Sequence, residues 1–307
     1  MTGKLSLCAV ICAVQLAGAA SALAEVVTLP PMQDTTLYQE NPESRSNGAG
    51  VYTFSGRTLN GDLRRALVAF DVAAAIPAGA VINSASLTLH LSRTSRAGPE
   101  SVALHRLLRA WGEGASDATA QEGTGAPATP QDATWAFSLV ATQTRWTTPG
   151  GDYAATASAA VTVGVIGTYT WPSTPELVAD VQSWVDEPAG NFGWIVLSDE
   201  SGGPSAKRFD SRENTSAAFR PALTLDYTLA PIEPIVISIA EAAGMLALNW
   251  NPGRPGLLYT VQTRASLTAG DWTPAAGGAW PIAETSWMDP MAATAAVRFY
   301  RVLASQP

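Results

Sequence analysis

Hydrophobic and polar residues alternate with a period of two along much of the chain. In the stretch ASLTLHL (85–91) every second residue is apolar, which predicts a strand with one buried face. Comparable short runs lie at 51–54, 65–70, 102–108, 194–197 and 222–227, and Gly, Pro, Asn and Asp separate them. This spacing is typical of an all-β sandwich.

One segment follows a helical period instead. In TPELVADVQSWVDEP the apolar residues between Leu177 and Val185 recur every three or four positions. Thr174 can cap the first turn, Pro175 fits inside it, and Pro188 ends the segment. We therefore expect one amphipathic helix of about three turns that covers one end or flank of the sandwich.

The remaining chain predicts loops and a second domain. Residues 112–134 and 147–160 are rich in small residues and lack periodicity, which indicates surface loops. Two prolines in LAPIEP mark a linker at 231–234. Alternation returns afterwards in LNW, YTV and FYRV, so residues 235–307 are expected to form a smaller β-sandwich.

The first 24 residues read as a targeting signal. Lys4 precedes an apolar stretch that ends in the small residues around Ala22 and Ala24, the layout of a secretory signal peptide. Residues 25–230 would then be the first folded domain of a secreted protein, extracellular or periplasmic. Cys8 and Cys12, the only cysteines, lie inside the signal, and no later stretch has the roughly 18 apolar residues of a membrane span.

Charge and motifs narrow the function classes. A formal charge of -8 disfavours nucleic acid as a partner. The chain contains no HExxH, GxSxG, P-loop or CxxC motif, and His90 and His105 are its only histidines. An enzyme is therefore disfavoured, although a polysaccharide lyase or hydrolase stays open.

The charged run RFDSREN (208–214) before the last strand of the first domain has two interpretations. As a strand it would point Arg212 and Glu213 to opposite faces, and Arg212 would pack against a carboxylate such as Asp71 or Asp226 to hold the fold. We favour this structural role. The alternative is a cationic patch that meets uronate carboxylates through arginine forks, formed by Arg64, Arg65, Lys207 and Arg208.

Aromatic residues supply the other means of binding sugars, because their rings stack on the apolar faces of pyranoses. Trp184 and Trp194 lie in strongly apolar patterns and are expected in the core, and Trp250 occupies the place of a core tryptophan in the second module. The three aromatics in or beside loops are the candidate exposed platforms for a sugar: Trp135, Trp146 and Tyr153. Plain packing against the fold is at least as strong an interpretation for them.

Carboxylates near predicted strand ends could hold a structural calcium ion, since hard cations prefer oxygen ligands. Turn and capping roles would explain the same residues equally well. The candidate ligands are Asp34, Asp199, Glu200 and Asp210, and no other cofactor is predicted.

Several segments together carry a resemblance to a known family. The stretch RFDSREN…FRPALTLDY resembles the closing strands of the DNRLRE domain, the disaggregatase-related repeat. Further pieces follow in the family's order over residues 30–228: Asp34 with SNGAG, LRRALVAFDV, Trp111 with Gly112-Glu113, TWAF, and ELVADVQSWVDEPAGNFGWIVL. The sequence departs from the family in two places. It reads FDSRE where the family more often has a small residue before Ser-Arg-Glu, and its 112–134 loop is long.

The resemblance implies a jelly-roll-like β-sandwich of secreted, polysaccharide-associated proteins, some classed as carbohydrate-binding module family 96 and specific for alginate. The C-terminal residues resemble a fibronectin type III-like module through LNW, YTVQ and FYRV. We therefore expect non-catalytic binding of an extracellular polysaccharide, anionic ones included. The alternatives are a structural or adhesive surface protein with a protein partner, and a polysaccharide-degrading enzyme.

Overall fold

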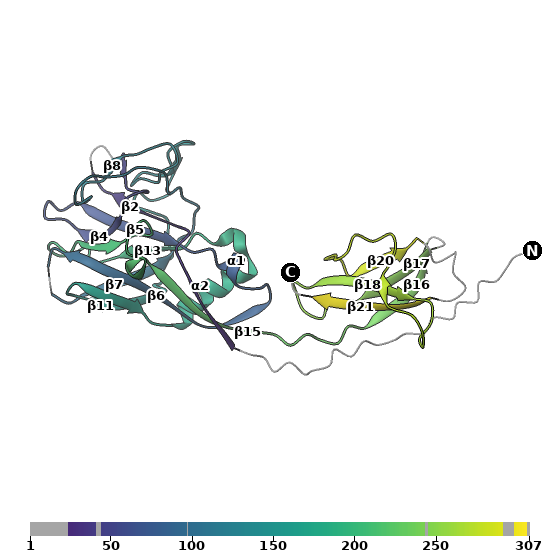
Figure 1. Ribbon diagram of the computed structural model, residues 1–307. Coiled ribbons are helices and arrows are strands. Elements are labelled where there is room, and N and C mark those ends of the chain that lie inside the picture. Colours follow the sequence, from purple (N-terminus) through teal and green to yellow (C-terminus); the bar gives the residue numbers. More distant parts are fainter. Residues whose placement is uncertain (1–23, 41–43, 97, 243–244, 291–297, 306–307) are drawn as a thin grey trace, which may run out of the picture. The chain divides into compact units, whose positions relative to one another are not determined.

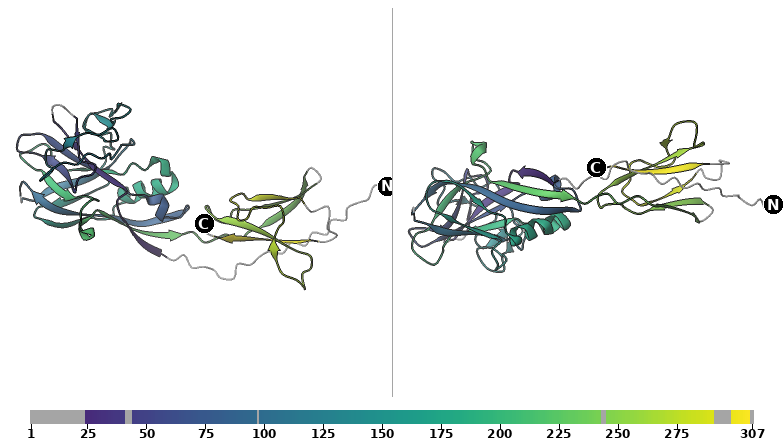
Figure 2. Two further views of the ribbon diagram at one scale, coloured as in Figure 1. Left: turned by 45° about the horizontal axis from the view of Figure 1, so that its top comes forward. Right: turned by 90° about the horizontal axis from the view of Figure 1, so that it is seen from below.

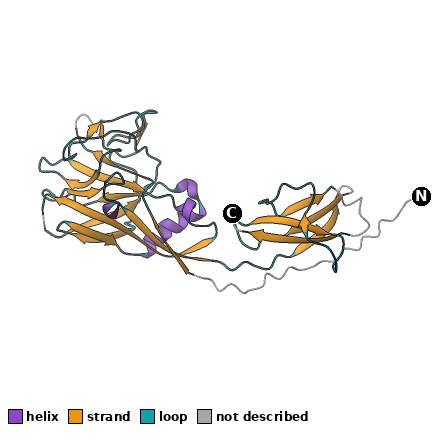
Figure 3. Cartoon of the chain, in the orientation of Figure 1, coloured by secondary structure: helices purple, strands orange, loops and turns teal. Residues whose placement is uncertain are grey.

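The computed structural model describes residues 24–40, 44–96, 98–242, 245–290 and 298–305. The predicted signal peptide, apart from Ala24, lies outside the described residues. The described chain is mostly β-structure with two α-helices (Figure 3), and it divides into two compact units, Ala24–Thr228 and Leu229–Pro307. Among the described residues, neither helix has the length and apolarity that crossing a bilayer requires.

The first unit is built on one large, curled antiparallel sheet of eleven strands (Figures 1 and 2). Its main path runs β1-β15-β6-β14-β4-β5-β13-β7-β11, with β12 also paired to β6 and β2 to β5. The strands are β1 (Ala24–Leu29), β2 (Gln33–Tyr38), β4 (Tyr52–Arg57), β5 (Leu63–Ala69), β6 (Ala80–Thr94), β7 (Glu100–Arg106), β11 (Ala159–Val163), β12 (Gly167–Trp171), β13 (Trp194–Leu197), β14 (Lys207–Asp210) and β15 (Ala222–Leu229).

Two small two-stranded sheets complete the β-structure of this unit. They join β3 (Arg45–Ser46) to β8 (Ala126–Pro127), and β9 (Phe137–Leu139) to β10 (Thr144–Arg145). The predicted strand runs fall within or overlap β4, β5, β6, β7, β13 and β15. In β6 the alternate residues Ala85, Leu87, Leu89 and Leu91 are buried, which confirms the period-two interpretation.

Helix α2 (Pro175–Asp186) confirms the helical segment. The Thr174 hydroxyl accepts a hydrogen bond from the Leu177 backbone N–H, so the predicted N-cap forms. The helix packs against β6 (Figure 1) and buries Trp184 against Trp194, with ring centroids 4.5 Å apart. These contacts confirm that both tryptophans belong to the core.

A second, four-residue helix was not predicted. Helix α1 (Val72–Ala75) follows Asp71, whose carboxylate accepts a hydrogen bond from the Ala74 N–H. A single turn gives too few residues to show a helical period. Short 3-10 turns also occur at η1 (Pro188–Gly190) and η2 (Ala217–Phe219).

The 112–134 segment is not a simple surface loop. It has little regular structure, yet it buries Ala118 and Ala133, and the Asp132 carboxylate accepts a hydrogen bond from Ser116 within it. Small side chains let this backbone lie close to the sheet, which a pattern search based on large apolar residues does not detect. Ala133 belongs to a buried cluster that also holds Leu37, Leu67, Ala69, Leu107, Trp111, Trp135, Trp146 and Ile195.

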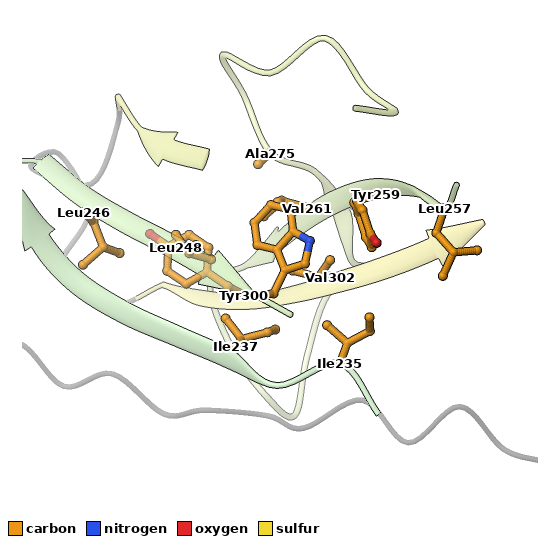
Figure 4. Close-up of a cluster of buried hydrophobic side chains, with 11 residues drawn as sticks. Ile235, Ile237, Leu246, Leu248, Leu257, Tyr259, Val261, Ala275, Tyr300 and Val302 are labelled. Carbon is orange, nitrogen blue, oxygen red and sulfur yellow. The ribbon is translucent and has the colours of Figure 1, made fainter. Parts of the chain in front are cut away.

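The second unit contains two three-stranded antiparallel sheets, β16-β17-β20 and β19-β18-β21. Residues of both sheets share one buried cluster, including Leu248 from one and Val261 and Val302 from the other (Figure 4). Trp250 also belongs to this cluster. The expected core position of Trp250 is thereby confirmed. The strands are β16 (Ile237–Ala242), β17 (Met245–Trp250), β18 (Leu258–Arg264), β19 (Thr273–Pro274), β20 (Ser286–Asp289) and β21 (Phe299–Ser305).

Candidate functional site

The charged run RFDSREN ends a strand and turns. Its first residues belong to β14, but Arg212 and Glu213 lie in the turn after it. Residues in a turn do not alternate between two faces as they do in a strand. The two side chains therefore lie close together, with Arg212 Nε 2.8 Å from Glu213 Oε1. The expectation that they face apart was therefore wrong.

The partner expected for Arg212 was also wrong. Arg212 Nε lies 2.7 Å from Glu113 Oε1, and Nη2 lies 3.2 Å from Glu113 Oε2. Asp71 instead caps α1 and Asp226 accepts a hydrogen bond from Asn83. The residue does hold distant segments together, because 99 sequence positions separate it from Glu113.

Asp34 completes this group from inside the sheet. It lies in β2 with only 1% of its surface exposed, and its Oδ2 accepts a hydrogen bond of 2.8 Å from the Arg212 backbone N–H. Its own backbone N–H donates to Glu113 Oε1, also at 2.8 Å. One carboxylate oxygen from each of Asp34, Glu113 and Glu213 lies within 4.8 Å of the other two. We call these three residues the carboxylate cluster.

Two glycines place Glu113 in the cluster. A Cβ atom at Gly112 would lie 2.0 Å from the Gln131 carbonyl oxygen, and one at Gly114 would lie 2.0 Å from Asp132 Oδ1. Gly114 also has a φ of +73°, which side chains disfavour. The sequence Gly-Glu-Gly thus lets the backbone approach the 131–132 segment and directs Glu113 toward β2.

Electrostatics in the cluster favour added positive charge. Burial raises the pKa of Asp34 well above its ordinary value, and the nearby Glu213 and Glu113 carboxylates raise it further. Burial also raises the pKa of Glu213. Burial disfavours the Arg212 cation, but the hydrogen bonds and charge of Glu113 outweigh it and raise the Arg212 pKa. One arginine therefore does not fully compensate three clustered carboxylates.

The four cations proposed as one patch do not form it. Arg64 and Arg65 are neighbours in β5 and point to opposite faces. Arg64 is buried and pairs with Glu40. Arg65 makes a two-point ion pair with Glu200, in which Nε lies 2.8 Å from Oε1 and Nη2 lies 2.8 Å from Oε2.

The two cations of β14 are also engaged. Lys207 is fully buried, with Nζ 2.6 Å from Glu100 Oε2. Arg208 lies over the Tyr52 ring at 3.7 Å and donates to Ser92 and Gln121. The predicted cationic patch is thus wrong in its geometry, because alternation divides these side chains between faces and carboxylates neutralise three of them.

Two of the three proposed aromatic platforms are buried. Trp135 and Trp146 are each only 4% exposed. Trp146 Nε1 donates to the Thr134 carbonyl at 2.8 Å, and the Trp135 ring lies 4.8 Å from the Arg65 guanidinium carbon. Of the two interpretations of these tryptophans, packing is therefore confirmed and exposure is wrong, because the small residues around them let the chain fold over the rings.

Tyr153 is the platform that remains accessible. Half-buried, it forms an isolated β-bridge with Leu107, the residue after β7, and packs edge-on against His105, with ring centroids 5.5 Å apart. An open cleft of about 460 Å³ lies beside it, and its other lining residues are Leu108, Arg109, Thr147, Thr148, Gly151 and Asp152. We call this the Tyr153 cleft.

The polar side of the Tyr153 cleft is fixed by Asp152. Its carboxylate accepts hydrogen bonds of 3.0 Å from the backbone N–H groups of Thr147 and Thr148, and one of 2.8 Å from Arg109 Nε. Burial acts in the opposite direction, but these bonds hold the Asp152 pKa below its ordinary value. The cleft therefore offers preorganised polar groups next to an aromatic ring and an exposed leucine.

The residues expected to bind calcium are not brought together. Asp199 accepts hydrogen bonds from Ser201 in a turn, and Glu200 pairs with Arg65. Asp210 lies 2.5 Å from His90 Nδ1. Asp34 alone of the four belongs to the carboxylate cluster, so that predicted ligand set was wrong, because strand-end position in sequence does not determine which ends meet.

Sequence reasoning missed Leu108, Arg109 and Asp152 as cleft residues and Glu113 as the partner of Arg212. Two signals were available. Leu107 and Leu108 follow β7 directly, and two adjacent leucines in an alternating run cannot both face the core, so one of them had to face solvent. The flanking glycines mark Glu113 as a position of close backbone approach.

No protein-family model matches the chain, and no curated protein matches it. Function is therefore inferred from the residues and geometry described above.

Proposed function

We propose that this chain is a secreted, non-catalytic carbohydrate-binding protein that recognises an extracellular polysaccharide. Its first unit is proposed to be a DNRLRE-type, jelly-roll-like sandwich, and its second a fibronectin type III-like sandwich. The observation that carries the functional proposal is the Tyr153 cleft.

The Tyr153 cleft has the chemistry that sugar recognition needs. A pyranose has an apolar face, which stacks on an aromatic ring, and a rim of hydroxyls, which needs fixed donors and acceptors. Tyr153 and Leu108, the latter 51% exposed, supply the apolar surface. Arg109 and Asp152, joined by a hydrogen bond, supply a donor and an acceptor held in place. An open cleft of this kind admits an internal segment of a polymer.

The charges at the cleft favour neutral sugars over uronates. Arg109 is already paired with Asp152, so the cleft presents a dipole and no unpaired cation. The other candidate cations Arg64, Arg65 and Lys207 are paired with carboxylates. A polyanion would have to displace one of these pairs, whereas a neutral polymer would not.

Affinity electrophoresis of the purified chain against alginate, pectin and neutral glucans tests the proposal. The chain is expected to be retarded by a neutral polymer. Tyr153→Ala should weaken that retardation roughly tenfold, since loss of a stacked ring costs on the order of 1 kcal/mol beyond its buried area.

Phe219→Ala is the matched control, because Phe219 is an aromatic residue 41% exposed that does not line the cleft. Retardation that is weakened in Tyr153→Ala but unchanged in Phe219→Ala would assign binding to the cleft. If no polymer retards the folded chain, or if Tyr153→Ala and Phe219→Ala behave alike, the proposal fails.

A structural or adhesive role is the second candidate, and one observation favours it. Val165 and Ile166, at the turn between β11 and β12, are 63% and 62% exposed. Adjacent exposed aliphatic residues suit a contact with another protein. Cross-linking that a Val165→Ser, Ile166→Ser variant abolishes, without any polysaccharide binding, would favour this role.

An enzyme is the least supported hypothesis. Asp152 is the only carboxylate among the described residues that line the Tyr153 cleft, and Arg109 and two backbone N–H groups hold it. A glycosidase needs two carboxylates on either side of the bond that it cleaves.

A further inference from the structure

We propose that the carboxylate cluster of Asp34, Glu113 and Glu213 binds a divalent cation, Ca²⁺, which ties three distant segments of the first unit together. The site is separate from the Tyr153 cleft and does not depend on sugar binding. Its residues come from β2, from the segment after Trp111, and from the turn after β14.

The first argument is an unsatisfied buried oxygen. Asp34 Oδ1 has no hydrogen-bond partner among the described residues, in a side chain that is almost completely buried. Glu213 Oε2 lacks a partner in the same way. Buried polar atoms without a partner are rare in folded proteins because they lose hydration without replacing it. The cluster therefore holds two buried carboxylate oxygens that are available to a cation.

The second argument is the charge balance. When all three carboxylates are ionised, they carry three negative charges, and Arg212, in contact with Glu113 and Glu213, carries one positive charge. Two negative charges remain uncompensated. A divalent cation brings the group to neutrality, whereas a monovalent one does not. Burying charge without compensation is costly, so the site favours a divalent ion.

The third argument concerns the size and type of the ion. The donors are all carboxylate oxygens, which select hard cations over zinc or copper. No two of the three oxygens are more than 4.8 Å apart, which is within the span of about 4.6–5.2 Å that two ligands on opposite sides of Ca²⁺ reach with Ca–O bonds of about 2.3–2.6 Å. Mg²⁺ requires bonds of about 2.0–2.1 Å in a near-ideal octahedron. Ca²⁺ accepts irregular arrangements of carboxylate oxygens, so this three-carboxylate cluster suits Ca²⁺ better than Mg²⁺.

An ion can reach the cluster from solvent. Asp34 forms its buried floor, while the side chains of Glu113 and Glu213 are 18% and 23% exposed. A bound ion would bridge β2, the segment after Trp111 and the turn after β14. Such a bridge stabilises the folded state by mass action, because the unfolded chain does not preassemble the ligands.

The test is calcium titration of the full chain after treatment with a chelator, followed by isothermal calorimetry and by thermal unfolding. We expect one binding event per chain and a Tm that rises with Ca²⁺ and saturates. Concentrations up to about 10 mM cover even the weak extracellular sites, which bind at about 10⁻⁴–10⁻³ M. Mg²⁺ at equal concentration should raise Tm less, and an equal response would overturn the choice of Ca²⁺.

The variants locate the ion. Glu213→Gln, at a partly exposed position, should weaken Ca²⁺ binding by at least about tenfold, and Asp34→Asn should remove it. Asp199→Asn is the matched control, since Asp199 is an exposed turn carboxylate outside the cluster, and it should bind Ca²⁺ like the parent chain. If Asp34→Asn fails to fold, Glu213→Gln alone carries the test.

Two results would overturn the proposal. The first is a folded parent chain that gives neither heat nor a Tm shift with Ca²⁺. Alternatively, Ca²⁺ affinity unchanged in Glu213→Gln would place the ion elsewhere on the chain.

Discussion

The Arg65 guanidinium donates two hydrogen bonds to the Glu200 carboxylate, with Nε and Nη2 each 2.8 Å from a different oxygen. The sequence suggested a sugar-binding role for the first residue and a calcium-binding role for the second, and the structure pairs them with each other. Arg65 also lies over the rings of Trp135 and Tyr153. This ion pair therefore holds Arg65 against Tyr153, one of the residues that line the Tyr153 cleft.

Arg65→Ala should destabilise the first unit. The change leaves Glu200 partly buried without its partner and removes the guanidinium from two aromatic rings, so we expect a loss of about 2–4 kcal/mol in the free energy of unfolding. Arg65→Lys should lose less, because it keeps the charge but not the two-point geometry. Urea denaturation measures both changes.

Arg106→Ala is the control for that experiment. Arg106 Nε lies 3.2 Å from Asp180 Oδ1, but its side chain is 38% exposed, and exposed pairs contribute about 0–1 kcal/mol. Equal losses in Arg65→Ala and Arg106→Ala would show that burial of the Arg65 pair adds nothing.

Ionic strength should hardly affect polysaccharide binding by this chain. Arg64, Arg65 and Lys207 are paired with carboxylates, so a polymer gains little from their charge. Electrophoretic retardation compared at low salt and at about 0.15 M, where the Debye length is about 8 Å, measures this. Retardation by alginate alone that fades with salt would instead support an anionic ligand.

Glu122 should make stability depend on pH. Burial raises its pKa above the ordinary 4.5, although the Asn47 amide and the N–H groups of Val51 and Tyr52 act in the opposite direction. The folded state then holds this proton more tightly than the unfolded state. The resulting stability is fully present below pH 4.5 and is lost as pH rises through the raised pKa.

Glu122→Gln is the variant that isolates this effect. It lacks the titrating group, so the free energy of unfolding of the parent chain should fall relative to that of the variant as pH rises from about 4 to about 7. Denaturation series at several pH values provide the comparison. A constant difference across the series would mean that the Glu122 pKa is the same in both states.

Trp171→Phe should cost about 1–3 kcal/mol. Trp171 is fully buried, packs against Phe209 and donates its indole N–H to the Val102 carbonyl at 2.8 Å. Phenylalanine leaves that buried carbonyl without this donor and leaves a cavity. Trp272→Phe, at a half-exposed position in the second unit, should change the unfolding free energy by less than about 0.5 kcal/mol. Thermal or urea unfolding distinguishes these outcomes.

Local patterns predicted the local structure well. Alternation located the main strands of the large sheet, and the spacing from Leu177 to Val185 with Thr174 in front located α2 and its cap. These signals succeed because strand and helix periods act over neighbouring residues and each element has one face toward the core.

Patterns failed where partners come from far along the chain. Neither the pairing of Arg212 with Glu113 nor that of Arg65 with Glu200 can be read from sequence, since 99 and 135 positions separate the partners. The sequence also could not predict that Trp135 is buried, for a related reason. Its neighbours are small, and only the folded path of the loops decides whether such a ring is covered.

The pairing of β1 with β15 constrains how this unit can be made. The two strands run in register from Ala24 opposite Thr228 to Leu29 opposite Leu223, and the hydroxyls of Thr28 and Thr224 meet although 196 positions separate them. During synthesis β1 is finished long before its partner emerges, and until then β1 and the neighbouring edge of β6 are unpaired. Unpaired strand edges invite aggregation. We therefore expect a nascent chain shorter than about 222 residues to need chaperone protection, and full-length chains to close the sheet in a late, slow step.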